Sequence, residues 1–168
     1  MTGAVAKTMV SGISTGLIMA FAAAPGQAHA AEPGALIGNW KLISWQVIAD
    51  DGAAQDIFGA KPKGYLVLTR EGRSIVVTTA EDRIAGTGDA ERAALHKSML
   101  AYSGKYRIEG NDFITKVDVS WNEDWNGTEQ RRHFRIEGDK LFIESAPAPS
   151  ITFPGRMDFR RIVWERER

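Results

Sequence analysis

The chain contains no cysteine among its 168 residues. Disulfides, zinc–thiolate sites and cysteine nucleophiles are therefore excluded, and a folded domain must draw its stability from packing. An excess of either charge is also absent, because 21 Lys and Arg residues balance 21 Asp and Glu residues. Nucleic-acid binding usually needs a strongly basic surface, so we expect no nucleic-acid partner.

Motifs of several common enzyme classes are missing as well. The chain has no Gly-x-Ser-x-Gly elbow, no phosphate-binding P-loop and no Gly-x-Gly-x-x-Gly fingerprint. Its histidines are His29, His96 and His133, and no two of them have a metal-binding spacing such as His-x-x-x-His. We therefore expect no metal and no cofactor, and we assign no catalytic residue.

A long apolar run occurs only near the N-terminus. Lys7 precedes an apolar stretch over residues 9–24, which glycine and serine interrupt and which is short for a membrane span. Ala28-His29-Ala30 then matches an A-x-A cleavage site. The pattern predicts a signal peptide over residues 1–30, cleaved after Ala30, and a periplasmic or secreted mature domain over residues 31–168. A retained N-terminal anchor is the alternative, and no later segment is apolar enough to span a membrane.

The rest of the chain reads as short strands separated by turn signals, with one helix between them. Asp89 can cap this helix, residues 90–100 are good helix formers, and Ser103-Gly104 would end it. The strand-like runs are 40–49, 64–69, 74–79, 105–108, 113–121, 128–136, 141–144 and 157–164. We predict a mainly β fold, an antiparallel up-and-down β-barrel of about 8–9 strands with a helix inserted at about residues 89–101. A β-sandwich would use the same strands.

Tryptophans at the two ends of the predicted domain favour the closed barrel. Gly38-Asn39-Trp40 opens the first strand, and Trp164-Glu165-Arg166 closes the last one. An indole can fill the narrow end of a small barrel, and a guanidinium from the neighbouring terminal strand can stack on it. We therefore predict structural roles for Gly38, Trp40, Trp164 and Arg166.

In this order and spacing, the motifs resemble the lipocalin-like domain proteins of bacteria and fungi, over nearly all of residues 36–166. The motifs are Gly38-Asn39-Trp40-Lys41-Leu42, Pro62-Lys63-Gly64-Tyr65-Leu66, Gly72-Arg73, residues 101–106, residues 125–130, Arg132, Leu141 and Trp164-Glu165-Arg166. The resemblance implies a calycin-type barrel that binds small apolar molecules. Many relatives carry a histidine near the position of Thr115, so His-based acid–base chemistry does not carry over to this chain.

Strand alternation predicts which side chains enter the barrel. Phe113, Thr115 and Val117 share the apolar face of their strand, and Arg132 and Phe134 share the apolar face of the next. An inward Arg132 either binds the carboxylate or carbonyl end of an apolar ligand, or lies near the rim paired with a local Glu or Asp. The predicted ligand-binding residues are Arg132, Tyr106, Thr115, Tyr65, Val117 and Phe134.

Two functions are compatible with this barrel. The favoured one is a secreted protein, monomer or homodimer, that binds a small apolar or amphipathic molecule without chemistry. The alternative is a cofactor-free isomerase, cyclase or hydrolase-like enzyme, with Tyr106 as the acid and Arg132 stabilising a developing oxyanion. A void of roughly 300 Å³ or more would support binding or catalysis, and a filled interior would indicate a structural role.

Overall fold

The computed structural model describes residues 33–168, so the predicted signal peptide lies outside the described residues. Its ten strands run in chain order from a 3₁₀ helix, η1 (Pro33–Leu36), to the C-terminus. The strands are β1 (Gly38–Ala49), β2 (Ala54–Asp56), β3 (Lys63–Leu68), β4 (Arg73–Thr79), β5 (Met99–Glu109), β6 (Asp112–Ser120), β7 (Glu129–Glu137), β8 (Lys140–Glu144), β9 (Ala148–Pro149) and β10 (Met157–Arg166). The helix α1 (Asp89–Lys97) lies between β4 and β5, and the 3₁₀ helix η2 (Glu123–Trp125) between β6 and β7.

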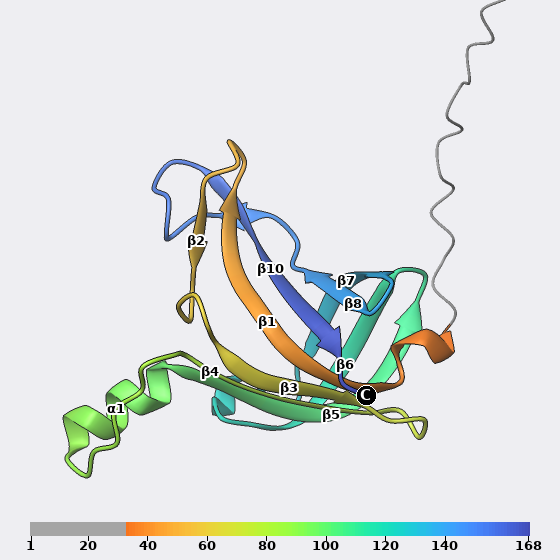
Figure 1. Cartoon of the computed structure of the whole chain (residues 1–168), viewed down its shortest axis with the longest axis horizontal. Helices are drawn as coiled ribbons and strands as arrows, with labels where there is room; N and C mark the ends of the chain where they lie inside the picture. Colours follow the sequence, from red (N-terminus) through yellow and green to blue (C-terminus); the bar gives the residue numbers. More distant parts are fainter. Residues whose placement is uncertain (1–32) are drawn as a thin grey trace, which may run out of the picture.

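The strands close into an antiparallel barrel, which confirms the predicted fold class. Neighbouring strands follow the order β1-β3-β4-β5-β6-β7-β8-β10, and β10 pairs back with β1 from Trp40↔Arg166 to Ala49↔Asp158. Closure leaves no unpaired edge in the ring. The short strands β2 and β9 add to the far ends of β1 and β10, which extend beyond the ring (Figure 1).

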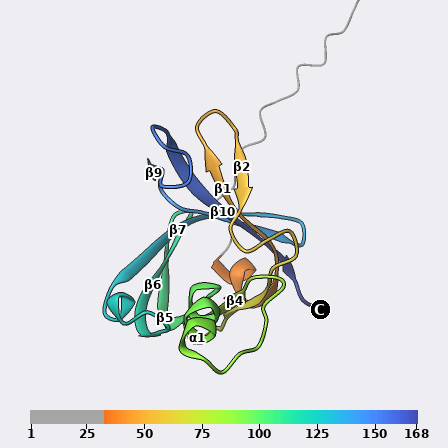
Figure 2. The ribbon, with the colours of Figure 1, turned by 90° about the vertical axis from the view of Figure 1, so that its left-hand side faces the viewer.

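The closed end of the barrel has the predicted plug. Trp40 is fully buried, its Nε1 donates to the Leu36 carbonyl at 2.9 Å, and the Arg166 guanidinium lies 4.1 Å from the ring centroid. Arg166 also donates to the carbonyls of Ile37 and Ala35, and Trp164 is buried beside this cluster. Gly38 has a φ of +141°, and a Cβ there would lie 2.8 Å from Arg166 Nη1. Viewed along the barrel, η1 lies behind the ring of strands (Figure 2).

Two β-bulges change which side chains face inward. In β1 the pairing with β10 shifts between Leu42 and Ser44, so Trp45, Val47 and Ala49 point inward after Trp40 and Leu42. Strict alternation along β1 would place apolar residues on both of its faces. The bulge instead gathers most of them on one face, and Ile43 is 41% exposed.

The second bulge lies between β5 and β6, at Ser103/Gly104. Phe113, Thr115 and Val117 are buried as predicted, but beyond the bulge Val119 is 65% exposed. A Cβ at Gly104 would lie 2.1 Å from the Lys116 carbonyl oxygen, so glycine is required where the two strands approach.

The inserted helix is shorter than predicted. It ends at Lys97, with Ser98 as its C-cap, and Met99 and Leu100 already pair with Thr79 and Thr78 of β4. Ser103 and Gly104 therefore lie within β5 and do not terminate the helix. Strand pairing overrides helix propensity at these residues, because each one added to β5 completes backbone hydrogen bonds with β4. No helix within residues 33–168 is long and apolar enough to cross a membrane.

Candidate ligand-binding cavity

The barrel contains a cavity of about 410 Å³ that communicates with solvent. This volume lies within the range of small-molecule sites. Fifteen residues form its wall, and they come from all eight strands of the ring, from η2 and from the segment after β8. They are Trp45, Leu66, Val76, Thr78, Leu100, Tyr102, Phe113, Trp125, Arg132, Ile143, Ser145, Ala146, Arg160, Ile162 and Trp164.

The strand register orders these residues by depth. Trp164 is the lining residue of β10 nearest the base plug, and Ile143, Ile162 and Trp45 form the following row because they are register partners. Ser145 and Arg160 come next, joined by the Ser145 N–H donating to the Arg160 carbonyl at 3.0 Å. The cavity is therefore apolar at its floor and gains polar groups toward its mouth.

Arg132 enters this polar row from β7. Its partner Phe113 lines the same cavity, and Arg132 Nη2 donates to Gln130 Oε1 at 3.0 Å while Nη1 donates to the Arg131 carbonyl at 2.8 Å. One of the two interpretations of Arg132 paired it with a local Glu or Asp at the rim. Among residues 33–168 it forms no such ion pair, and the nearby Glu109 and Asp112 pair with Arg131 instead. The guanidinium instead contacts neutral acceptors only, which leaves its charge without a counterion.

Tyr102 adds a hydroxyl to the middle of the cavity wall. Burial raises the pKa of Tyr102, and the nearby Arg132 charge partly opposes this shift. The phenol therefore stays protonated at neutral pH and can donate a hydrogen bond. Its ring lies 5.5 Å from that of Trp125, which in turn meets Trp121 edge-to-face at 5.0 Å. This aromatic group covers one side of the opening.

The other predicted ligand-binding residues lie elsewhere. Tyr65 was predicted to line the barrel interior, and this is wrong: its side chain is 48% exposed on the outer face, because Leu66 and Leu68 take the inward positions of β3. Tyr106 is partly buried against the core, but its hydroxyl donates to the Thr69 carbonyl at 2.9 Å. Thr115, Val117 and Phe134 are buried inside the barrel without lining the cavity.

The predicted ligand-binding residues did not include Arg160, Tyr102, Trp45 and Ser145, which all line the cavity. Arg160 was not among the residues predicted to enter the barrel. The signal was present, because Arg160 shares its face of β10 with Ile162 and Trp164, the same inward face that carries the predicted plug residue. Trp45 was missed because the bulge in β1 turns it inward.

The wall of the cavity carries no Asp, Glu or His. In addition, no group of three or more His, Cys, Asp or Glu within residues 33–168 is placed to hold a metal ion. The polar groups that line the cavity are two guanidiniums, three hydroxyls and indole N–H groups. This arrangement can orient hydrogen-bond acceptors and anions, and none of its members is an ordinary general base at neutral pH.

A closed antiparallel barrel with an apolar cavity open at one end defines a class of proteins that enclose small molecules. A family model for the lipocalin-like domain matches residues 37–167 of this chain. The chain therefore belongs to the lipocalin-like domain family, which confirms the resemblance inferred from its motifs. A search of curated proteins found no match.

Proposed function

We propose that this protein binds one small apolar or amphipathic molecule in the barrel cavity and performs no chemistry on it. The proposal rests on the cavity of about 410 Å³, whose floor and walls are formed mainly by aliphatic and aromatic side chains. Burial of apolar ligand surface against such walls provides the driving force, at about 25 cal/mol per Å². The few polar groups near the mouth would set the orientation of the ligand.

No specific observation favours the enzyme alternative. It assigned the acid role to Tyr106, whose hydroxyl is engaged by the Thr69 carbonyl and which does not line the cavity. Arg132 does line the cavity, but the cavity wall has no Asp, Glu or His to act as a general base beside it.

The binding proposal is tested with two substitutions at adjacent positions of β4. Val76 points into the cavity and Val77 lies on the outer face, 45% exposed. Val76→Phe should fill part of the cavity and abolish or strongly weaken binding of an apolar probe such as methyl decanoate. Val77→Phe, the matched control, should bind as the parent does. Equal binding by both variants would contradict the proposal, and urea melts verify that both are folded.

Native mass spectrometry of protein purified from its own host would identify a co-purified ligand directly. We also propose export, since residues 1–30 have the pattern of a signal peptide. N-terminal sequencing of the protein from its host is expected to give Ala31 as the first residue. A mature protein that begins at Met1 would remove the periplasmic or secreted assignment.

A further inference from the structure

Two Arg-Arg pairs in this chain lie on strands that pass the mouth of the cavity. Arg131-Arg132 belongs to β7 and Arg160-Arg161 to β10. Successive strand residues point to opposite faces, so each pair sends one guanidinium outward and one toward the barrel interior. Arg132 and Arg160 line the cavity.

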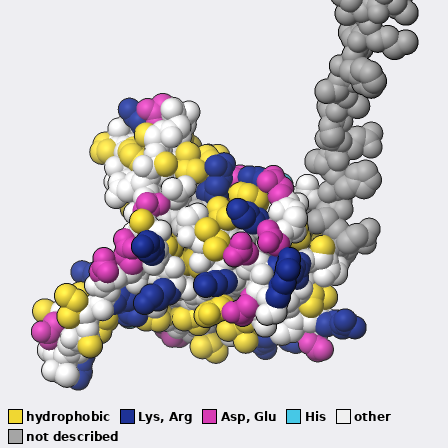
Figure 3. All heavy atoms as spheres, viewed as in Figure 1, with side chains coloured by type: hydrophobic (Ala, Val, Ile, Leu, Met, Phe, Trp, Pro, Cys, Tyr) yellow, Lys and Arg dark blue, Asp and Glu magenta, His cyan; other side chains and the backbone are white. Residues whose placement is uncertain are grey.

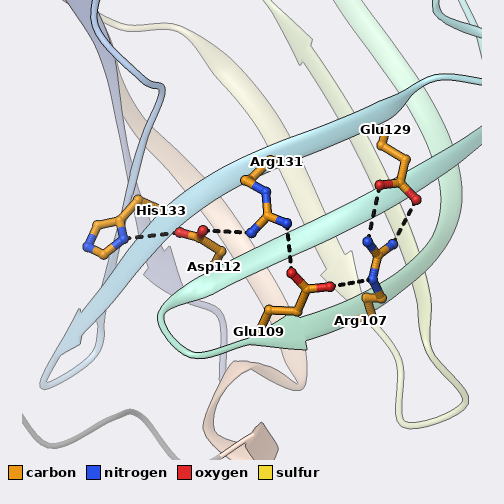
Figure 4. Close-up of polar contacts among 6 residues, drawn as sticks. All are labelled: Arg107, Glu109, Asp112, Glu129, Arg131 and His133. Carbon is orange, nitrogen blue, oxygen red and sulfur yellow. Dashed lines mark hydrogen bonds and ion pairs between the residues drawn. The ribbon is translucent and has the colours of Figure 1, made fainter.

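The outward members are paired with carboxylates. Arg131 lies 2.7 Å from Glu109 and 2.9 Å from Asp112, within a network that also holds Arg107, Glu129 and His133 (Figure 4). Arg161 lies 2.7 Å from Glu144. On the face shown in Figure 3, basic and acidic side chains are likewise interspersed. Charge on the outside of the barrel is thus compensated locally.

The inward members differ in this respect. Within residues 33–168, neither Arg132 nor Arg160 forms an ion pair with a carboxylate, and the cavity wall has no acidic residue to supply one. Two positive charges at the mouth of an apolar cavity raise the free energy of the empty protein, because partial burial weakens their solvation and they repel each other. An anion placed between them would remove both penalties.

The register places both guanidiniums within reach of one ligand group. Glu144 of β8 pairs with His133 on one side and Arg161 on the other, so Ser145 lies between Arg132 and Arg160. Two interstrand spacings then separate the arginine Cα atoms, about 10 Å in all. Arginine side chains can converge across this gap over the Ser145 hydroxyl.

We propose that Arg132 and Arg160 together bind the anionic group of the ligand, so that the natural ligand is an apolar acid whose ionised carboxylate or comparable anion lies at the mouth of the cavity. This inference rests on the proposed function and narrows its ligand class. The apolar body of the acid occupies the cavity toward Trp164, and the Tyr102 hydroxyl provides a further donor. A site that offers donors and positive charge but no acceptor carboxylate rejects cationic ligands.

The experiment compares decanoic acid with methyl decanoate by calorimetric titration at neutral pH. The parent protein should prefer the acid. Arg132→Gln and Arg160→Gln should each weaken binding of the acid by about tenfold to hundredfold and leave binding of the ester unchanged. The matched controls are Arg131→Gln and Arg161→Gln, adjacent residues on the outer face, and they should bind both compounds as the parent does.

The outcomes separate the inference from the function on which it rests. If the parent binds neither compound, the proposed function fails as well. If it binds acid and ester equally, or if Arg160→Gln behaves like Arg161→Gln, binding stands and the paired guanidinium site is overturned.

A measurement on the parent protein avoids any problem of variant folding. Carboxyl-labelled decanoic acid is titrated in its bound state by NMR. Two guanidiniums should lower the pKa of the bound carboxyl below that of the free acid, whereas apolar burial without them would raise it. A bound pKa equal to or above the free value would overturn the inference.

Discussion

At the closed end of the barrel the guanidinium of Arg166 is surrounded by partners from the protein. At the open end Arg132 and Arg160 form no ion pair with a described carboxylate. Arg166 stacks on Trp40 and donates to the carbonyls of Ile37 and Ala35. Arg132 reaches only a neutral amide and a backbone carbonyl. The difference shows that Arg166 has its partners within the protein, whereas the proposed function leaves the partners of Arg132 and Arg160 to a ligand.

The largest expected effect tests the closed end. Trp40→Ala removes a fully buried indole and breaks the bond to the Leu36 carbonyl, so we expect a loss of about 3–5 kcal/mol in the free energy of unfolding. Urea melts measure it. Trp121→Ala, a partly exposed residue near the mouth, serves as the comparison and should cost far less. A loss below about 1 kcal/mol for Trp40→Ala would contradict the assignment of Trp40 to the core.

Matched arginine substitutions at the two ends sharpen the contrast. Arg166→Gln breaks the stacking on Trp40 and the two carbonyl contacts, so it should cost about 1.5–3 kcal/mol of unfolding free energy. Arg160→Gln should change stability by less than about 0.5 kcal/mol, or increase it, because an uncompensated charge is removed. Thermal and urea melts compare the two variants. Similar losses for both would mean that Arg160 also has a structural partner, and the contrast between the ends would fail.

A smaller effect is expected at Tyr102. Tyr102→Phe deletes one hydroxyl from the cavity wall and keeps the ring against Trp125. Binding of decanoic acid should weaken by about 0.5–1.5 kcal/mol, the usual value of a neutral hydrogen bond, with stability unchanged. Titration calorimetry measures the effect on affinity, and urea melts measure the effect on stability. If stability falls and affinity does not, Tyr102 is a core residue only.

The smallest effect concerns the outer network of Figure 4. Hydrogen bonds from Arg131 and then Arg107 lower the pKa of Glu109, and those from Arg131 and then His133 lower the pKa of Asp112. A lowered folded-state pKa means that the contribution is present above the ordinary carboxyl range and is lost as the pH falls through it toward the folded-state value.

Urea melts at a series of acidic pH values measure this contribution. Because the groups are exposed, we expect only a slight extra loss on acidification, which added salt should reduce further. Glu109→Gln should remove part of the pH dependence. An unchanged pH profile in that variant would show that the network contributes nothing measurable.

Alternation within single strands correctly predicted several placements before any tertiary contact was known. Arg132 and Phe113 face the interior. The motifs at the two ends of the domain likewise predicted that Trp40 and Arg166 meet at the base. The same rule applied to β3 would have turned Tyr65 outward, since Leu66 and Leu68 must share the opposite face. Of the predicted ligand-binding residues, Arg132 lines the cavity, and Arg160 could have been added from the inward face of β10.

Other features could not be inferred from local pattern. A bulge inserts a residue into one strand of a pair, so the inward face changes partway along β1 and again in β6, and a single sequence does not mark the position. The end of α1 at Lys97 was equally hidden, because Met99 and Leu100 suit a helix and become strand only through pairing with β4.

The sequence by itself determined a cysteine-free, charge-balanced β domain with a Trp/Arg plug, since residue types and a period of two are local properties. Tertiary structure alone decided that a cavity of about 410 Å³ remains open inside the barrel. It also decided that Arg132 and Arg160 line this cavity, whose described wall contains no acidic residue. The physical reason is that unfilled volume and the absence of a counterion depend on how eight strands from across the whole chain register against one another.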